Sequence, residues 1–188
     1  MSTVLILADF SGDKASKTTA ELATVASRIG SVTAVVLAGS GKGASLAATV
    51  NQGPIANILV IESDDFATHG VAASADALAQ IVKEKSPAAL LIASHAFGKE
   101  VAARVAVLTD SGVITDAVDV SADITATQLV FGGSTTVHSK VSHGTAIITV
   151  RPIAWKQISL HHLLQLKMQL QRLAPMQRRR LFRHHNLP

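Results

Sequence analysis

Residues 88–120 read AALLIASHAFGKEVAARVAVLTDSGVITDAVDV, and this stretch decides the fold of the chain. It begins with Ala88 to Ala93, a continuous apolar run that is short enough for a strand buried on both faces of a sheet. A helix is expected to open at Gly98, because apolar residues then recur at intervals of four and three. They are Val101, Val105 and Leu108, and they make one apolar face.

The second half of this stretch predicts the end of the helix and another strand. Gly112 is typical of a helix C-terminus, and Val113 to Val120 form an apolar run with strand character. The connection between two strands through one helix almost always makes the strands parallel. We therefore expect the two strands of this unit to be parallel neighbours in one sheet.

The preceding part of the chain repeats this alternation of strands and helices. Leu78, Ile81 and Val82 are expected on the inner face of the longest of these helices. Such an alternation predicts an α/β fold with a doubly wound, mostly parallel sheet covered by helices on both sides. The expected strands are Thr3–Ala8, Ser31–Ala38 and Asn57–Glu62, and the expected helices run from an N-cap at Ser16 to Ile29, from Ala44 to Asn51 and from Ala72 to Glu84.

After Val120 the pattern changes to short β runs with no helix between them. These runs are Gln128–Phe131, Thr135–Val141 and Thr145–Val150, and Gly-containing turns separate them. Alternating apolar and polar residues in short runs are typical of antiparallel strands. We expect all three runs to be antiparallel strands at one end of the sheet.

Composition limits the class of protein. The 188 residues include no Cys, so disulfides and thiol chemistry are excluded. No apolar run reaches the roughly 18 residues that a membrane-spanning helix needs. The N-terminus enters a strand within three residues, without a signal-like segment. A soluble protein of the bacterial cytoplasm is the expectation.

The positive charge is concentrated in the last part of the chain. Residues 1–150 hold nine Lys/Arg and all thirteen Asp/Glu, a net charge of −4, whereas residues 151–188 hold eight Lys/Arg and no acid. The first part therefore gives no reason to expect nucleic acid as a partner. We expect a division into an α/β domain, residues 1–152, and a basic tail, residues 153–188, that is not a domain.

The helix and second strand of the opening stretch carry a resemblance to a known family. Their residues resemble the G-R-D-x-A-x-R-x-A…G…(S/T)-D segment of the electron transfer flavoprotein alpha subunit, with Lys99 and Glu100 in place of the usual Arg and Asp. The resemblance extends from Thr3 to the triplet Thr149-Val150-Arg151. The matching residues are Gly98-Lys99-Glu100-Val101-Ala102-Ala103-Arg104-Val105-Ala106, Gly112 and Thr115-Asp116.

This resemblance implies a fold of the adenine nucleotide alpha hydrolase-like type and a role in electron transport, including fatty acid β-oxidation. In the family, alpha and beta subunits form a heterodimer that takes electrons from dehydrogenases to the respiratory chain. FAD lies mainly in the C-terminal domain of alpha, whereas the first domain packs against beta as a scaffold. The resemblance assigns no catalytic, cofactor-binding or metal-binding residue to this chain, and no FAD, nucleic-acid or membrane binding is expected of it.

The composition of the tail differs from that of the rest of the chain. Leu, Gln, Arg, His and Pro make up 24 of the 36 residues from Ile153 to Pro188, and these five amino acids share codons that begin with C. Ala codons read one base late also begin with C. We infer that the tail is the out-of-frame reading of an Ala-rich linker that leads to the flavin domain, so the chain is expected to be a truncated alpha subunit. We expect the tail to be disordered or weakly helical.

Two glycine-containing segments could hold an anion. The loop Gly39 to Gly43 could cradle a phosphate on its backbone N–H groups, with Lys42 as counter-charge. It lacks Walker spacing, and we prefer to interpret it as a flexible loop. Gly98 at a helix N-terminus has anion-site geometry as well. The alternative, which we prefer, is that Gly98 permits a sharp turn and Arg104 pairs with Glu100.

Other polar residues have structural explanations. His95, His138 and His143 could meet as metal ligands, but their spacing favours separate loop and edge positions. Asp9, Ser11 and Asp13 follow the first strand, where α/β folds place ligands, yet turn chemistry explains these residue types equally well. Two further hypotheses remain: a stand-alone nucleotide-binding module of the same fold, and a binding protein that acts through its basic tail.

Overall fold

Eight strands form one sheet in the order β5-β4-β1-β6-β10-β7-β8-β9. The computed structural model describes residues 2–50 and 53–152, and the expectations for the tail fall outside the described residues. The strands of this sheet are β1 (Thr3–Leu7), β4 (Ser31–Ala38), β5 (Ile55–Glu62), β6 (Ala89–Ala93), β7 (Val113–Val120), β8 (Ala126–Val130), β9 (Thr135–Ser139) and β10 (Ala146–Val150).

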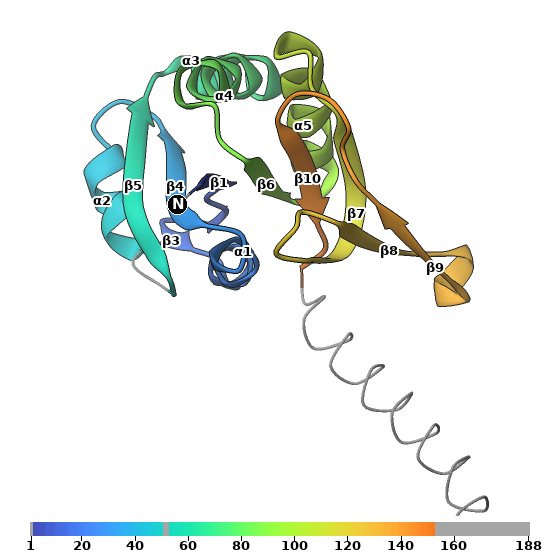
Figure 1. The fold of residues 1–188 in the computed structure, drawn as a ribbon. Coiled ribbons are helices and arrows are strands. Elements are labelled where there is room, and N and C mark those ends of the chain that lie inside the picture. Colours follow the sequence, from blue (N-terminus) through green and yellow to red (C-terminus); the bar gives the residue numbers. More distant parts are fainter. Residues whose placement is uncertain (1, 51–52, 153–188) are drawn as a thin grey trace, which may run out of the picture. The chain divides into compact units, whose positions relative to one another are not determined.

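Helices cover both faces of the sheet, as the alternation in the sequence predicts (Figure 1). Alternate residues of β1 point to opposite faces of the sheet. Val4 and Ile6 pack in the core on the α1 side, whereas Leu5 packs with α4 and α5. The doubly wound α/β class is therefore confirmed. The helices are α1 (Lys17–Ser27), α2 (Gly43–Thr49), α3 (Asp65–Thr68), α4 (Val71–Lys85) and α5 (Ala96–Leu108).

The position of β10 corrects two of our expectations. This strand is parallel to both of its neighbours, β6 and β7, and it lies between them. The predicted antiparallel arrangement of Thr145–Val150 is wrong, and β6 and β7 are parallel but not neighbours. All five residues of β10 are buried: Ile147 belongs to the core cluster that includes α5, and Ile148 belongs to the cluster that includes α1. A central parallel strand needs such a run of buried residues.

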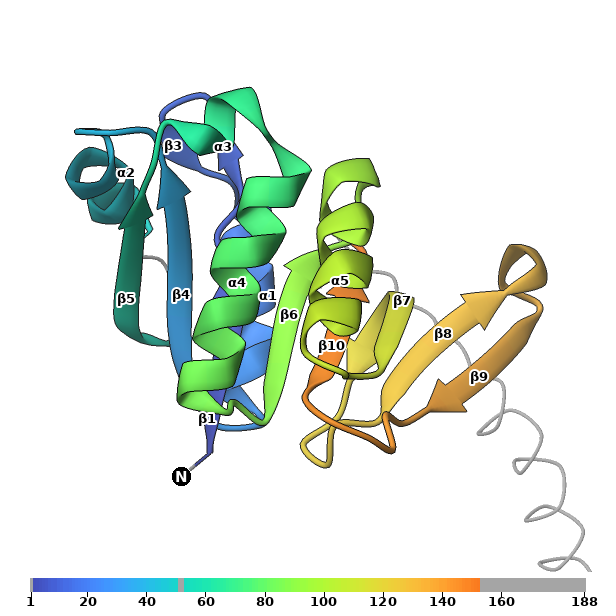
Figure 2. The same ribbon diagram turned by 90° about the horizontal axis from the view of Figure 1, so that it is seen from above.

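The two preceding strands are antiparallel, as predicted. β8 pairs with β7 and β9 pairs with β8, both in antiparallel register. They form a hairpin that extends from the end of the sheet (Figure 2). The predicted strand Gln128–Phe131 ends one residue earlier, because Phe131 opens a single 3-10 turn, η1 (Phe131–Gly133).

Smaller differences concern element ends and short elements. Helix α5 begins at Ala96, two residues before Gly98, and Leu108 is 42% exposed, so it does not belong to the buried face. Ser16 is the N-cap of α1 as predicted, although the helix ends at Ser27. The short helix α3 and the small hairpin of β2 (Phe10–Ser11) and β3 (Lys14–Ala15) were not predicted.

Candidate functional site

Asp116 is the centre of the main polar cluster of the described residues. It lies within β7 at a φ of 59°, in the left-handed region that Asp tolerates better than most residues. The pairing of β7 with β10 shifts here, because Ile114 and Ala117 face Ile148 and Val150. β7 therefore has one extra residue at this point, and the Asp116 N–H donates to the Thr149 hydroxyl at 3.0 Å.

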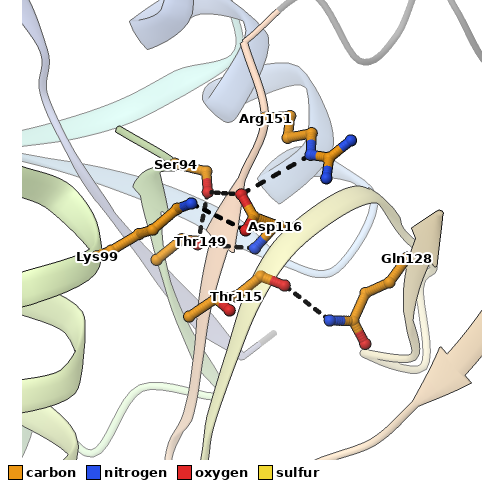
Figure 3. A network of polar contacts seen from close by, with 7 residues as sticks. All are labelled: Ser94, Lys99, Thr115, Asp116, Gln128, Thr149 and Arg151. Carbon is orange, nitrogen blue, oxygen red and sulfur yellow. Dashed lines mark hydrogen bonds and ion pairs between the residues drawn. The ribbon is translucent and has the colours of Figure 1, made fainter. Parts of the chain in front are cut away.

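The Asp116 carboxylate joins side chains from three other parts of the fold (Figure 3). The Ser94 hydroxyl, just after β6, donates to Oδ1 at 2.7 Å. The ammonium of Lys99, in α5, donates to Oδ2 at 2.8 Å. The guanidinium Nε of Arg151, just after β10, lies 3.7 Å from Oδ1. The carboxylate thus ties the ends of β6 and β10 to α5 and β7.

The surroundings of Asp116 lower the pKa of its carboxyl below the ordinary value of 3.8. Partial burial alone would raise the pKa, but hydrogen bonds from Lys99 and Ser94 and the positive charges of Lys99 and Arg151 outweigh it. Asp116 is consequently ionised at neutral pH.

Backbone and neutral side-chain bonds hold this cluster in place. The buried Thr149 hydroxyl donates to Ser94 Oγ at 3.0 Å while it accepts the Asp116 N–H. The Arg151 N–H donates to the Ala117 carbonyl at 2.8 Å. Gln128 of β8 donates to the Thr115 carbonyl at 2.7 Å, so the antiparallel hairpin also supports the bulge. The backbone N–H groups of Asp116 and Arg151 are therefore both bound within the fold.

The ends of β1 and β6 form the point where the strand order reverses, the usual ligand position in this fold class. Here His95 Nε2 lies 3.2 Å from Asp9 Oδ1, and the Ser16 hydroxyl donates to Asp9 Oδ2 at 2.7 Å. His95 is also the N-cap of α5, since its Nδ1 accepts the Gly98 N–H at 3.0 Å. A side chain of the protein thus takes the amide that the Gly98 anion hypothesis requires.

Gly98 lies in the first turn of α5 and not in the turn before the helix, so its role is close packing and not the expected sharp turn. A Cβ at this position would collide with the Ala93 carbonyl oxygen, so the helix can approach β6 only with glycine here. Arg104 lies 3.7 Å from Glu100, one helical turn away, as expected. Lys99 points to Asp116 instead of the helix N-terminus.

The loop Gly39–Gly43 does not present an empty phosphate cradle either. The Glu62 carboxylate accepts the N–H of Gly43 at 2.6 Å and that of Gly41 at 3.2 Å, and Asp64 accepts the Ser40 N–H at 3.1 Å. These acids lie in and after β5, and no signal in the sequence pointed to their bonds with this loop. The loop is held in place by its own acidic neighbours.

The histidines and the first-strand acids are dispersed, apart from Asp9 and His95. His138 contacts Thr127 and His143 contacts Asp110, each on a different element. Among residues 2–50 and 53–152, no three His, Cys, Asp or Glu side chains are grouped as metal ligands. Ser11 and Asp13 are exposed on the β2–β3 hairpin.

At the two glycine-containing segments, protein side chains already accept the backbone N–H groups that the pyrophosphate of FAD would need. A flavin dinucleotide needs backbone N–H groups for its pyrophosphate, and the amides of Gly41, Gly43 and Gly98 all donate to side chains of the protein. Three surface hollows of about 300–420 Å³ lie around α4, and Ala residues contribute much of their lining.

None of the described helices is long and apolar enough to cross a membrane.

The mostly parallel, doubly wound sheet with an antiparallel hairpin defines an α/β protein of the doubly wound class. A family model described as the electron transfer flavoprotein domain matches residues 4–177. The chain belongs to this family.

Individual relatives agree with this assignment. The chain is 36% identical over 151 residues to an electron transfer flavoprotein subunit alpha of Mycobacterium tuberculosis and 34% identical over 151 residues to that of Mycobacterium leprae. Each match covers 80% of this chain and 48% of the relative, so the chain spans about half the length of these curated relatives. A putative electron transfer flavoprotein subunit of Escherichia coli, YdiR, is 37% identical over 81 residues, 42% of this chain and 26% of the relative.

Proposed function

We propose that residues 1–152 act as the first domain of an alpha-type electron transfer flavoprotein subunit in a bacterial cytoplasm. In this role the domain packs against a beta subunit and serves as a scaffold, and the assembled heterodimer carries electrons from dehydrogenases to the respiratory chain. The chain is then a carrier subunit and not an enzyme.

One observation carries this proposal: the family-like segments, far apart in the sequence, meet in one cluster. Lys99 and Asp116 belong to the segment that resembles the family, and Arg151 ends the triplet at the far end of the resemblance. The Asp116 carboxylate contacts both cations. The alternative, a stand-alone nucleotide-binding module, has less support, because N–H groups in both candidate loops already donate to protein side chains.

Co-expression with the beta subunit of the same organism tests the proposal. We expect the two chains to co-elute in gel filtration as an equimolar complex, and we expect the chain alone to self-associate. The beta subunit with an unrelated α/β protein of similar size is the control. Separate elution of the two chains after co-expression would contradict the proposal.

The cofactor is a separate prediction. Because the amides of Gly41, Gly43 and Gly98 are occupied, we expect the purified chain alone to retain no flavin after incubation with FAD and gel filtration. The measurement is the visible absorbance of the protein peak. A stoichiometric flavin band would contradict it.

A further inference from the structure

Two cations meet a single carboxylate at the ends of β6 and β10. Lys99 and Arg151 both lie against Asp116, and no other acidic side chain pairs with either of them among the described residues. The three side chains are 41%, 44% and 34% exposed, respectively. One positive charge is therefore left over at a place that solvent and solutes reach.

Hydrogen-bond donors also remain available in this cluster. An ammonium group has three N–H donors, and Lys99 uses one of them on Asp116. Arg151 has five guanidinium donors, and its Nε lies at ion-pair distance from Asp116, 3.7 Å, which is too long for a hydrogen bond. Within residues 2–50 and 53–152 its guanidinium has no hydrogen-bond partner. Two of its N–H groups can therefore donate to the two oxygens of an oxyanion in bidentate geometry.

The cluster has a fixed and strained geometry. Asp116 holds a left-handed backbone conformation at an extra residue of β7, and its N–H is taken by a side chain, Thr149, in place of a strand carbonyl. The backbone N–H of Arg151 is bound to Ala117 at 2.8 Å. Strained positions of this kind persist where a function or a surrounding network maintains them. This one faces the carboxyl edge of parallel strands, where α/β folds bind ligands.

We propose that Lys99 and Arg151 form a subsite for an anionic group, a phosphate or a carboxylate, and that the Asp116 carboxylate is the internal anion with which this group competes for the two cations. Asp116 contacts both cations at the same edge, and their remaining donors bind the incoming oxyanion. The anion can belong to a free phosphate compound or to an acidic side chain of a docking protein. The proposal does not depend on the beta subunit, because the chain alone binds the anion.

Titration of the ¹⁵N-labelled chain with sodium phosphate at constant ionic strength and pH 7 tests this subsite by NMR. We expect saturable shifts of the Lys99, Asp116 and Arg151 signals, and loss of saturation in Lys99→Gln and in Arg151→Gln. Asp116→Asn keeps the side-chain shape but removes the competing charge, so phosphate should bind about three- to tenfold more tightly. Parallel titration with acetate distinguishes the two sources, because a phosphate subsite prefers phosphate at least tenfold and a carboxylate subsite binds both comparably.

A matched control comes from another exposed ion pair. Lys140 lies 3.4 Å from Asp123, and Lys140→Gln should leave phosphate binding unchanged. Dispersed amide spectra verify that each variant is folded, and Arg151→Lys, which keeps the charge, replaces Arg151→Gln if the latter unfolds, with a weakened and not abolished affinity. Absence of saturable shifts in both the wild-type chain and Asp116→Asn would overturn the proposal, as would an unchanged affinity in both Lys99→Gln and the Arg151 variant.

Discussion

Gly98 shows how one residue determines the distance between a helix and a strand. A Cβ at this position would collide with the Ala93 carbonyl oxygen and lie 3.0 Å from a methyl group of Ile92. Backbone atoms cannot move aside as a flexible side chain does. The close contact of α5 with β6 therefore depends on the absence of a side chain.

The first prediction at this scale is that Gly98→Ala destabilises the fold. Overpacking against a backbone carbonyl should lower the free energy of unfolding by about 1–3 kcal/mol. Urea unfolding followed by circular dichroism measures it. Gly39→Ala is the control, since the nearest atom to its added Cβ, Asp64 Oδ1, is 4.0 Å away. Equal stability of Gly98→Ala and the wild-type chain would contradict the proposed close approach.

The second residue-scale prediction concerns the pH dependence of stability. The pKa of Asp116 is lowered in the folded chain, so its ionised form adds stability that is present above the unfolded pKa of 3.8 and is lost as the pH falls further. Asp116→Asn should lower the free energy of unfolding by about 1 kcal/mol at pH 7, a value kept small because solvent screens the partly exposed carboxylate. The loss should be smaller below pH 3.8. Asn tolerates the left-handed backbone, so the comparison isolates the charge.

The free energy of unfolding, measured at pH 7 and again below pH 3.8, tests the direction of this pH dependence. The difference between the wild-type chain and Asp116→Asn should shrink at the lower pH. A difference that stays constant, or grows, would show that Asp116 does not act through its charge.

At the scale of elements, the local sequence pattern predicted whether a segment is a helix or a strand better than it predicted the place of a strand in the sheet. The continuous apolar run of β6 and the helical spacing in α4 and α5 are local signals, and each element was found where they indicated. Strand order depends on which crossovers form, and β10 shows this limit, because the sequence AIITV fits an edge strand or a central one. The meeting of Lys99, Asp116 and Arg151 depends on the same order and on an unpredicted bulge, so the sequence did not foretell the cluster.

The central position of β10 predicts a large cost for changes in its core residues. Ile148 is fully buried and faces the α1 side of the sheet. Ile148→Ala should lower the free energy of unfolding by about 2–5 kcal/mol, because it removes apolar contacts and leaves a cavity. Ile58→Ala on the edge strand β5, where the side chain is 39% exposed, is the control and should cost less. Similar losses for both variants, measured by urea unfolding, would place β10 outside the core.

At the scale of the whole domain, the sheet has two open edges, β5 and β9. Residues 55–61 of β5 read IANILVI and carry no charge, and Ile58 and Val60 are more than one-third exposed. Edge strands of soluble proteins commonly carry Lys or Pro against edge-to-edge association. We expect an uncharged apolar edge of this kind to favour association with another strand.

We therefore expect Ile58→Lys to reduce self-association of the chain alone. A charge at the middle of the β5 edge opposes pairing with another strand, so the apparent mass in light scattering should fall. Val107→Lys adds the same charge on α5, where the side chain is 83% exposed, and should change the apparent mass less. If both variants behave alike, net charge and not the strand edge governs association.

The insertion of β10 between β6 and β7 bears on how the domain forms during translation. A ribosome makes β1, β4, β5 and β6 first and then the meander of β7, β8 and β9, so each group can begin to pair before β10 exists. Only when residues 146–150 emerge do the two groups join through a common strand. Contacts between distant parts of a sequence form slowly. Until that step the nascent chain exposes the two strand edges that β10 later covers, and unpaired edges of this kind favour aggregation.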